Sequence, residues 1–278
     1  MSAEPNSTAR APRLVTSNPL LPLSIVQHNC LGSLSVFLSL FNSLKACHPT
    51  PHIVAIQDPP VWNSRLPSFR MFKAFHPPAT MRNRPRVATY IHQDLLQSAS
   101  VLPCLLDRLD TMAIDIHSQQ GLFGSKYKIF RLYNSYSVNG TSCSSRTLSP
   151  QDLFPSHPFP TITMGDFNLH HPLPDPLRKL SSQDISVSAP YFDRAADLGF
   201  SLLNVPGTFT RFPFDSSTRP GVLDISFANP AAAPFFQSWE PPSRPPGQTM
   251  FPLPYYSLRP CYAHHPLLPT GTRQTGTP

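Results

Sequence analysis

The sequence predicts an α/β layered sandwich, and the order of its apolar segments is the main reason. A short apolar run, Leu23–His28, precedes a helical apolar stripe within Ser33–Cys47 and a second run, His52–Gln57. This strand–helix–strand order implies two parallel strands, because a parallel pair needs a crossover connection. Strands then outnumber helices, as in a layered sandwich. Further strands are expected at Arg70–Phe75, Arg86–Ile91, Leu109–Ile116, Lys126–Tyr133, Phe159–Met164 and Val222–Phe227, with helices at Pro150–Phe154 and Pro190–Gly199.

The prolines divide the chain into three parts. The sequence has 36 prolines in 278 residues, and they concentrate in the first 23 residues and after Trp239. Segments of this composition bury too little apolar surface to offset the loss of chain entropy. We therefore expect a disordered lead over 1–23, one globular domain over 24–240, and a disordered Pro-rich tail over 241–278.

Charge and cysteine content narrow the classes of partner. The net charge of +7 favours polyanions such as nucleic acid. The five cysteines lie far apart without zinc-ligand spacing, so neither a disulfide framework nor a structural zinc is expected. No apolar run reaches the length of a membrane span, and the apolar stretch before Val26 is interrupted by prolines, unlike a signal peptide. We expect an intracellular protein that is not secreted and has no membrane partner.

Polar residues occur at four places at the ends of the predicted strands or inside them. Asn29 and Asp58 each follow a strand, Asp166 and Asn168 belong to a Gly-Asp-Phe-Asn turn, and Asp224 lies within the last strand. Strand ends at one sheet edge converge in space even when they are distant in sequence. A single aspartate after a strand is usually a turn residue, so only the combination points to a site.

These residue types suit phosphoester chemistry. Oxygen ligands from Asp58 and Asn29 would hold a hard divalent cation. Asp166 would orient or deprotonate the attacking water, Asn168 would position it, and Tyr133 would donate to a phosphoryl oxygen. The adjacent His170 and His171 point to opposite sides of an extended chain, so they are not expected to share a metal ion.

The series of motifs resembles the endonuclease/exonuclease/phosphatase superfamily, and within it the apurinic-type endonuclease of fungal LINE-type (non-LTR) retrotransposons. The resemblance rests on Gln27–Asn29, Ile53–Pro59, Met164–Pro172 and Leu202–Pro230, in the family's order. Together these motifs are specific, whereas each alone is weak.

The resemblance implies a four-layer α/β sandwich and Mg²⁺-dependent (or Mn²⁺-dependent) cleavage of DNA, without a small-molecule cofactor. It assigns Asn29 and Asp58 to the metal, and Asp166, Asn168, Tyr133 and Asp224 to catalysis. Asp224 would orient a histidine. His170, His171 and Arg211 are the candidates for substrate contacts. A nuclear location is also implied.

Two departures from the family bear on activity. Asp58 stands where the family usually has Glu, and the Ser-Asp-His motif expected after the Asp224 strand is missing. Where it should fall, the chain reads Gly247–Pro252, whose codons can encode Ser-Asp-His-Val-Pro when read two bases later. We therefore predict a frameshift between about Phe236 and Pro246, a missing last strand and greatly reduced activity.

Two other functions stay open. The chain could be another phosphoesterase of the superfamily, although the retroelement-like segments argue against this. It could also be a non-catalytic nucleic-acid-binding relic. In that case its binding face would use the arginines Arg65, Arg70, Arg82, Arg84 and Arg86.

Overall fold

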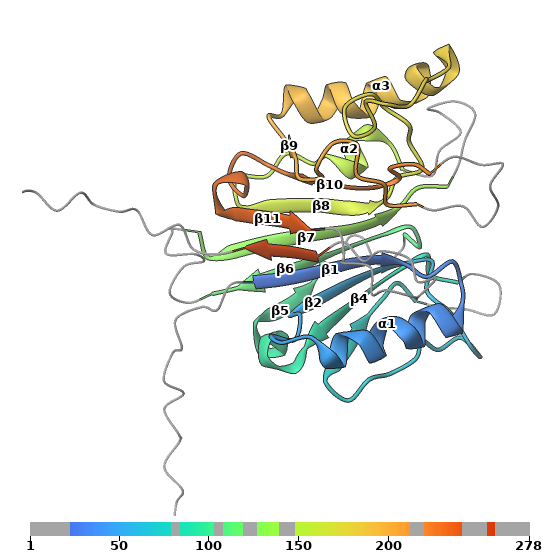
Figure 1. Ribbon diagram of the computed structural model, residues 1–278. Coiled ribbons are helices and arrows are strands. Elements are labelled where there is room, and N and C mark those ends of the chain that lie inside the picture. Colours follow the sequence, from blue (N-terminus) through green and yellow to red (C-terminus); the bar gives the residue numbers. More distant parts are fainter. Residues whose placement is uncertain are drawn as a thin grey trace, which may run out of the picture.

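A computed structural model describes residues 23–78, 84–102, 108–118, 127–138, 148–211, 220–240 and the backbone of 255–258. Two mixed β-sheets pack face to face between helices (Figure 1). The predicted α/β sandwich is therefore confirmed. No helix in these ranges is long and apolar enough to cross a bilayer.

The first sheet is built around the predicted parallel pair. From edge to edge it contains β11 (Phe236–Glu240), β12 (Tyr255–Leu258), β1 (Leu23–Asn29), β2 (Ile53–Gln57), β4 (Val87–His92) and β3 (Phe72–Phe75). Strands β1 and β2 run parallel, with Asn29 opposite Gln57. The connecting helix α1 (Leu34–Ala46) begins after Ser33, whose hydroxyl accepts a hydrogen bond from the Val36 amide.

The second sheet carries the Gly-Asp-Phe-Asn turn. From edge to edge it contains β5 (Ala99–Val101), β6 (Thr111–His117), β7 (Ile129–Tyr136), β8 (Thr161–Asp166), β10 (Asp224–Ala228) and β9 (Ser201–Leu202). The short helix α2 (Pro150–Leu153) and helix α3 (Ser182–Asp197) cover its outer face. Two 3₁₀ helices, η1 (Gln93–Ser98) and η5 (Ala233–Phe235), precede β5 and β11.

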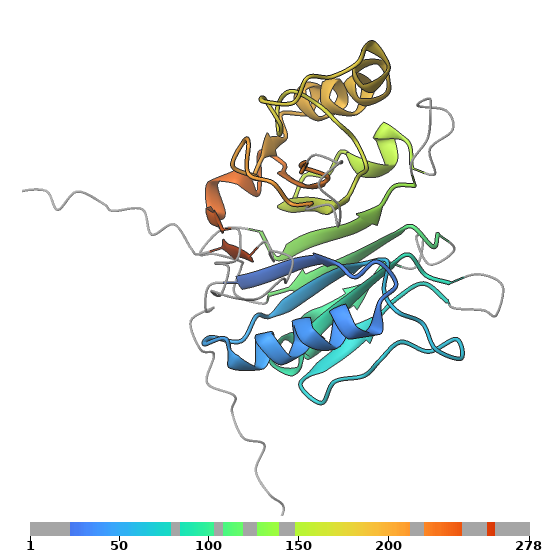
Figure 2. The ribbon, with the colours of Figure 1, turned by 45° about the vertical axis from the view of Figure 1, so that its right-hand side comes forward.

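Three apolar clusters make the sandwich four layers thick. One lies between the sheets, a second joins the second sheet to α2 and α3, and a third joins the first sheet to α1. Figure 2 shows α1 and α3 on opposite outer sides of the molecule.

Asn134 on β7 ties the two sheets together. Its side-chain amide donates to the carbonyl oxygens of Ile56 (3.1 Å) and Ala88 (3.0 Å), and its oxygen accepts from Gln57 Nε2 (2.6 Å). The residue is fully buried, so these bonds satisfy polar groups that water cannot reach. They also hold the strand ends of the two sheets at a set distance.

Three expectations about the elements were wrong. The last strand was expected to be missing, but β12 pairs with β1, Leu258 opposite Leu23, inside the segment that we assigned to the tail. This pairing covers the edge of β1. Helix α3 begins eight residues before Pro190, at a capping box formed by Ser181 and Asp184. Strand β7 ends at Tyr136 rather than at Tyr133.

Candidate active site

The polar strand ends of the two sheets meet on one side of the sandwich, at the right in Figure 1. Asn29 ends β1 in the first sheet, and Asp166 ends β8 in the second. The Asn29 Nδ2 atom donates to Asp166 Oδ2 at 2.6 Å, across 137 positions of the sequence. The two residues that the sequence placed at separate strand ends are thus in direct contact.

Asp166 is held from two sides. Besides the bond from Asn29, its Oδ1 accepts a hydrogen bond from the Asn168 backbone amide at 3.1 Å. The Asn168 side chain in turn donates to the Ser137 carbonyl at 2.9 Å. Asp166 is only 5% exposed, so its orientation is set by these neighbours and not by water.

The Gly-Asp-Phe-Asn turn needs its first and last residues for steric reasons. A Cβ atom on Gly165 would lie 1.8 Å from the Ser135 carbonyl oxygen, so only glycine lets β8 lie this close to β7. Asn168 adopts a positive φ of 48°, which asparagine tolerates better than most residues. The turn therefore aims Asp166 and Asn168 into the same region.

Asp224 lies directly opposite Asp166 on the neighbouring strand. Burial and then the Asp166 carboxylate raise the pKa of Asp224 well above its usual range. Gln27 Nε2 donates to Asp224 Oδ1 at a long 3.4 Å, and Thr210 supplies a second side-chain bond. Within the described ranges no histidine bonds to this carboxyl, and Gly247–Pro252 lie outside those ranges.

Asp58 follows β2 with a positive φ of 44° and is bound by two arginines. Arg84 Nη2 lies 2.5 Å and Arg86 Nε 3.3 Å from Asp58 Oδ1. The Arg86 guanidinium also lies over the Tyr136 ring, 4.1 Å from its centre. Tyr136 pairs with Asp166 across β7 and β8, so Asp58, Arg86, Tyr136 and Asp166 form one connected group.

Tyr136, and not Tyr133, is the tyrosine of this group. Side chains alternate along a strand, and Tyr133 points to the outer face of β7, where its hydroxyl bonds to His157 Nε2 at 2.7 Å. The structure therefore does not bring Tyr133 into this group, where the sequence analysis expected it. Burial raises the pKa of Tyr136, so its hydroxyl keeps the proton that it would donate.

The three residues expected to contact substrate do not all lie together in the structure. His171 stacks on Phe192 of α3, with ring centres 3.7 Å apart, and its Nδ1 accepts from the Leu173 amide. It packs against the protein and does not face the polar cluster. His170 is half-buried beside Gly221, and the Arg211 backbone pairs with Gly221. His170 and Arg211 therefore lie near each other, on the segment that leads to Asp224.

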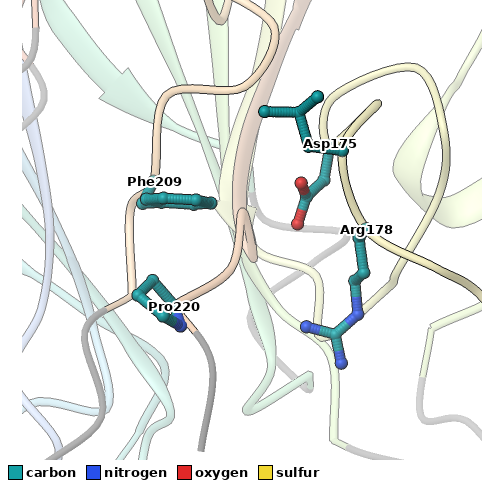
Figure 3. A pocket seen from close by; sticks show the side chains of 5 residues that line it. Asp175, Arg178, Phe209 and Pro220 are labelled. Carbon is teal, nitrogen blue, oxygen red and sulfur yellow. The ribbon is translucent and has the colours of Figure 1, made fainter.

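A cavity of about 230 Å³ opens beside this segment. Figure 3 shows Phe209 and Pro220 across from Asp175 and Arg178. Asp175 is 2% exposed, and its Oδ2 has no hydrogen-bond partner among the described residues. The cavity thus combines apolar walls with a buried acceptor and a cation. The sequence analysis missed it, because its lining comes from two loops that are far apart in the chain.

Asp58 and Asn29 are the residues that could hold a divalent cation at this site. In the described part of the chain no three His, Cys, Asp or Glu side chains converge on a metal position. Asp58 and Asn29 offer oxygen atoms at neighbouring strand ends, and Mg²⁺ typically binds one or two carboxylates together with substrate phosphate. These residues fit a cation that is shared with the substrate. The two arginines on Asp58 supply the balancing positive charge in this structure.

Comparison with known proteins identifies the fold. No family model and no curated protein matches the sequence. Among solved structures, the chain is similar to the endonuclease domain of TRAS1, a telomere-specific non-LTR retrotransposon, with 15% identity and a TM-score of 0.63 over 86% of this chain and 99% of that one. It is also similar to the AP endonuclease LMAP from Leishmania major, with 14% identity and a TM-score of 0.61 over 86% and 88%.

A third neighbour is the 3′-5′ exonuclease NExo from Neisseria meningitidis, with 16% identity and a TM-score of 0.58 over 85% and 99% of the two chains. All three are members of the endonuclease/exonuclease/phosphatase superfamily. At these identities the likeness concerns the fold. The chain has the α/β sandwich fold of the endonuclease/exonuclease/phosphatase superfamily.

Proposed function

We propose that this chain is a DNA-nicking phosphodiesterase domain of a LINE-type retroelement, with activity greatly reduced by the absence of the catalytic histidine. The observation that carries the proposal is the hydrogen-bonded group Asn29–Asp166–Asn168, with Asp224 opposite Asp166. The similarity to the TRAS1 endonuclease domain supports the choice of substrate and origin.

Each residue has a role that follows from its position. Asp166, oriented by Asn29 and by the Asn168 amide, would accept a proton from the attacking water. Tyr136 and Asn168 would donate hydrogen bonds to phosphoryl oxygens. A divalent cation held by Asp58 and Asn29 would polarise the phosphate and stabilise the developing charge.

The cavity lined by Phe209 and Arg178 would hold part of the DNA next to the scissile phosphate. It adjoins His170 and Arg211, on the segment that leads to Asp224. The Arg178 and Arg211 guanidinium groups are suited to phosphate oxygens, because their donors match that geometry. His171 has no part in this proposal.

The expected weakness has a physical reason. A group that stabilises charge in the transition state typically contributes about two to three orders of magnitude in rate. Asp224 has no histidine partner within the described residues, and the frame change that we predict near residues 236–246 would account for the loss. Sequencing the gene across these codons tests that part directly.

The test of function is nicking of supercoiled plasmid in Mg²⁺, side by side with the TRAS1 endonuclease domain. We expect slow, EDTA-sensitive nicking that Asp166→Asn abolishes and that Asp197→Asn, an exposed carboxylate on α3, leaves unchanged. Nicking as fast as that of TRAS1 would contradict the proposed impairment. Nicking that survives Asp166→Asn would refute the proposed role of the cluster.

One observation favours a second function, DNA binding without chemistry. Arg84 and Arg86 already neutralise Asp58, so the carboxylate does not need a metal ion in order to be stable. In that case the protein would bind DNA with strong salt dependence and would not nick it at any Mg²⁺ concentration. Of the other arginines predicted for such a face, Arg65 and Arg70 are exposed, and Arg82 lies outside the described residues.

A further inference from the structure

A tight hairpin turn follows Asp58 and carries an exposed tryptophan. Trp62 and Arg65 exchange two backbone hydrogen bonds of 2.9 Å each. Between them, Asn63 and Ser64 both have positive φ, 49° and 59°, as a two-residue type I′ turn requires. The turn therefore fixes the backbone on both sides of the Trp62 side chain.

This hairpin is anchored firmly to the body of the protein. Pro59 is buried at its start. After it, the Tyr90 hydroxyl donates to the Pro67 carbonyl at 2.8 Å, and Phe69 stacks on Phe41 of α1 with ring centres 3.9 Å apart. Since both ends are packed, the turn presents Trp62 on a rigid support.

Trp62 itself is 77% exposed. Among the large hydrophobic residues that are exposed in the described ranges, it is the aromatic one. An indole is a large flat apolar surface, and leaving it in water forgoes the free energy that its burial would provide. A single exposed leucine would need no explanation, but a tryptophan on a rigid turn has the properties of a binding contact.

The surroundings of Trp62 indicate the kind of partner. It is four residues from Asp58, and four residues span at most about 14 Å. Arg65, its partner in the turn, is exposed, and the Arg84 side chain on Asp58 is 47% exposed. A flat apolar ring between arginines matches nucleic acid, in which aromatic bases alternate with phosphates.

The other side of Asp58 has a similar feature. The Gly32 amide donates to the Asp58 carbonyl at 2.7 Å, which places the loop after β1 against the start of the hairpin. In that loop Leu31 is 51% exposed at a positive φ of 52°, an unfavourable conformation for leucine. Strained, exposed residues of this kind cluster at ligand sites.

We propose that Trp62 stacks on an unstacked base of the bound DNA, next to the phosphate that faces the Asp58–Asp166 group, with Arg65 on a neighbouring phosphate. This inference rests on the proposed function, because it takes DNA as the ligand. Stacking accepts any base, so the contact would position the strand without selecting sequence.

Tryptophan fluorescence provides a direct test. The chain has two tryptophans, and the second, Trp239, is buried at 6% exposure. In an Asp166→Asn background, a labelled duplex with a short single-stranded gap is titrated, and affinity is followed independently by anisotropy of the DNA label. We expect quenching that saturates with binding and that disappears in Trp62→Phe, which retains only Trp239.

Affinity distinguishes stacking from mere proximity. Trp62→Ala should weaken binding about 5- to 100-fold, the range for loss of one base–aromatic contact. Trp62→Phe should retain most of the affinity, and Ile185→Ala, an exposed apolar residue on α3, should retain all of it.

The outcomes separate this inference from the proposed function. If the labelled DNA binds but Trp62 fluorescence does not change, or if Trp62→Ala binds as tightly as the parent, the stacking contact is refuted, and the plasmid-nicking assay decides the proposed function separately. If the DNA does not bind and the wild-type chain does not nick plasmid, both are refuted.

Discussion

The buried carboxylates Asp166 and Asp224 allow a quantitative test of how charge in the site affects the stability of the fold. They lie opposite each other on β8 and β10, at 5% and 8% exposure. Burial and then the charge of Asp166 hold the pKa of Asp224 well above the usual 3.8. Two hydrogen bonds, from Gln27 and Thr210, offset only part of this cost. Asp224→Asn removes one charge with almost no change in shape.

The sign of the effect follows from linkage. Below pH 3.8 the carboxyl is protonated in both the folded and the unfolded chain, so Asp224→Asn should change stability little. As pH rises from there, the unfolded wild type releases this proton more readily than the folded one, and wild-type stability falls until the folded pKa is passed. Asp224→Asn has no carboxyl at this position and does not lose this stability. Its stability relative to wild type therefore increases with pH and then becomes constant.

The stability that Asp224→Asn gains over wild type depends on the difference between the pKa of Asp224 in the folded and in the unfolded chain. Each unit of difference corresponds to about 1.4 kcal/mol. For a domain of this size, 1 kcal/mol shifts the melting temperature by about 2–4 °C. One unit would therefore stabilise Asp224→Asn by roughly 3–6 °C at pH 8.

Thermal unfolding of wild type and variant between pH 4 and pH 9, in EDTA at constant ionic strength, measures this difference. Asp197→Asn, at an exposed position, is the matched control and should show a small difference that does not grow with pH. An Asp224→Asn chain that is less stable than wild type at pH 8 would refute the reasoning. So would a stability difference that does not depend on pH.

Three further predictions concern residues that support or line the site. Gly165→Ala should cost about 3 kcal/mol or more, because its Cβ would lie 1.8 Å from the Ser135 carbonyl oxygen; urea unfolding that shows less than 1 kcal/mol would contradict this. Asn134→Ala should destabilise by about 2–3 kcal/mol in the same assay, because the buried carbonyls of Ile56 and Ala88 each lose a donor and Gln57 Nε2 loses its acceptor; a near-neutral result would mean that the sheets are not held by these bonds. Tyr136→Phe should slow plasmid nicking at least tenfold if its hydroxyl contacts phosphate, whereas Tyr133→Phe should leave the rate unchanged; equal effects would show that the face of β7 has been misassigned.

Much of the local structure could be predicted from the sequence because its causes are local. Alternating and continuous apolar runs mark β1, β2, β4 and β8 to within about two residues, and Ser33 begins α1 as a capping residue should. The capping box of Ser181 and Asp184 was an equally local signal for the start of α3, but Pro190 inside the helix drew the prediction to a later start. A proline in a helix interior normally ends or kinks it, and here packing against the second sheet prevails.

What the sequence by itself determined was the inventory of the site and the order of its strands. Asn29, Asp58, Asp166 and Asn168 stand at strand ends, and the strand–helix–strand opening puts the first two on neighbouring parallel strands. Only the tertiary structure decided which of these residues meet. The contact between Asn29 and Asp166 crosses between two sheets, the arginines on Asp58 come from the entry to β4, and β12 completes the edge of β1.

Tyr136 illustrates the physical reason. Strand periodicity shows that two tyrosines three positions apart face opposite sides, but it does not show which side faces the other sheet. The sequence therefore did not decide between Tyr133 and Tyr136, and the structure places Tyr136 beside Asp166. Register and the packing of one sheet on another are set by the sum of many long-range contacts, and no window of the sequence contains them.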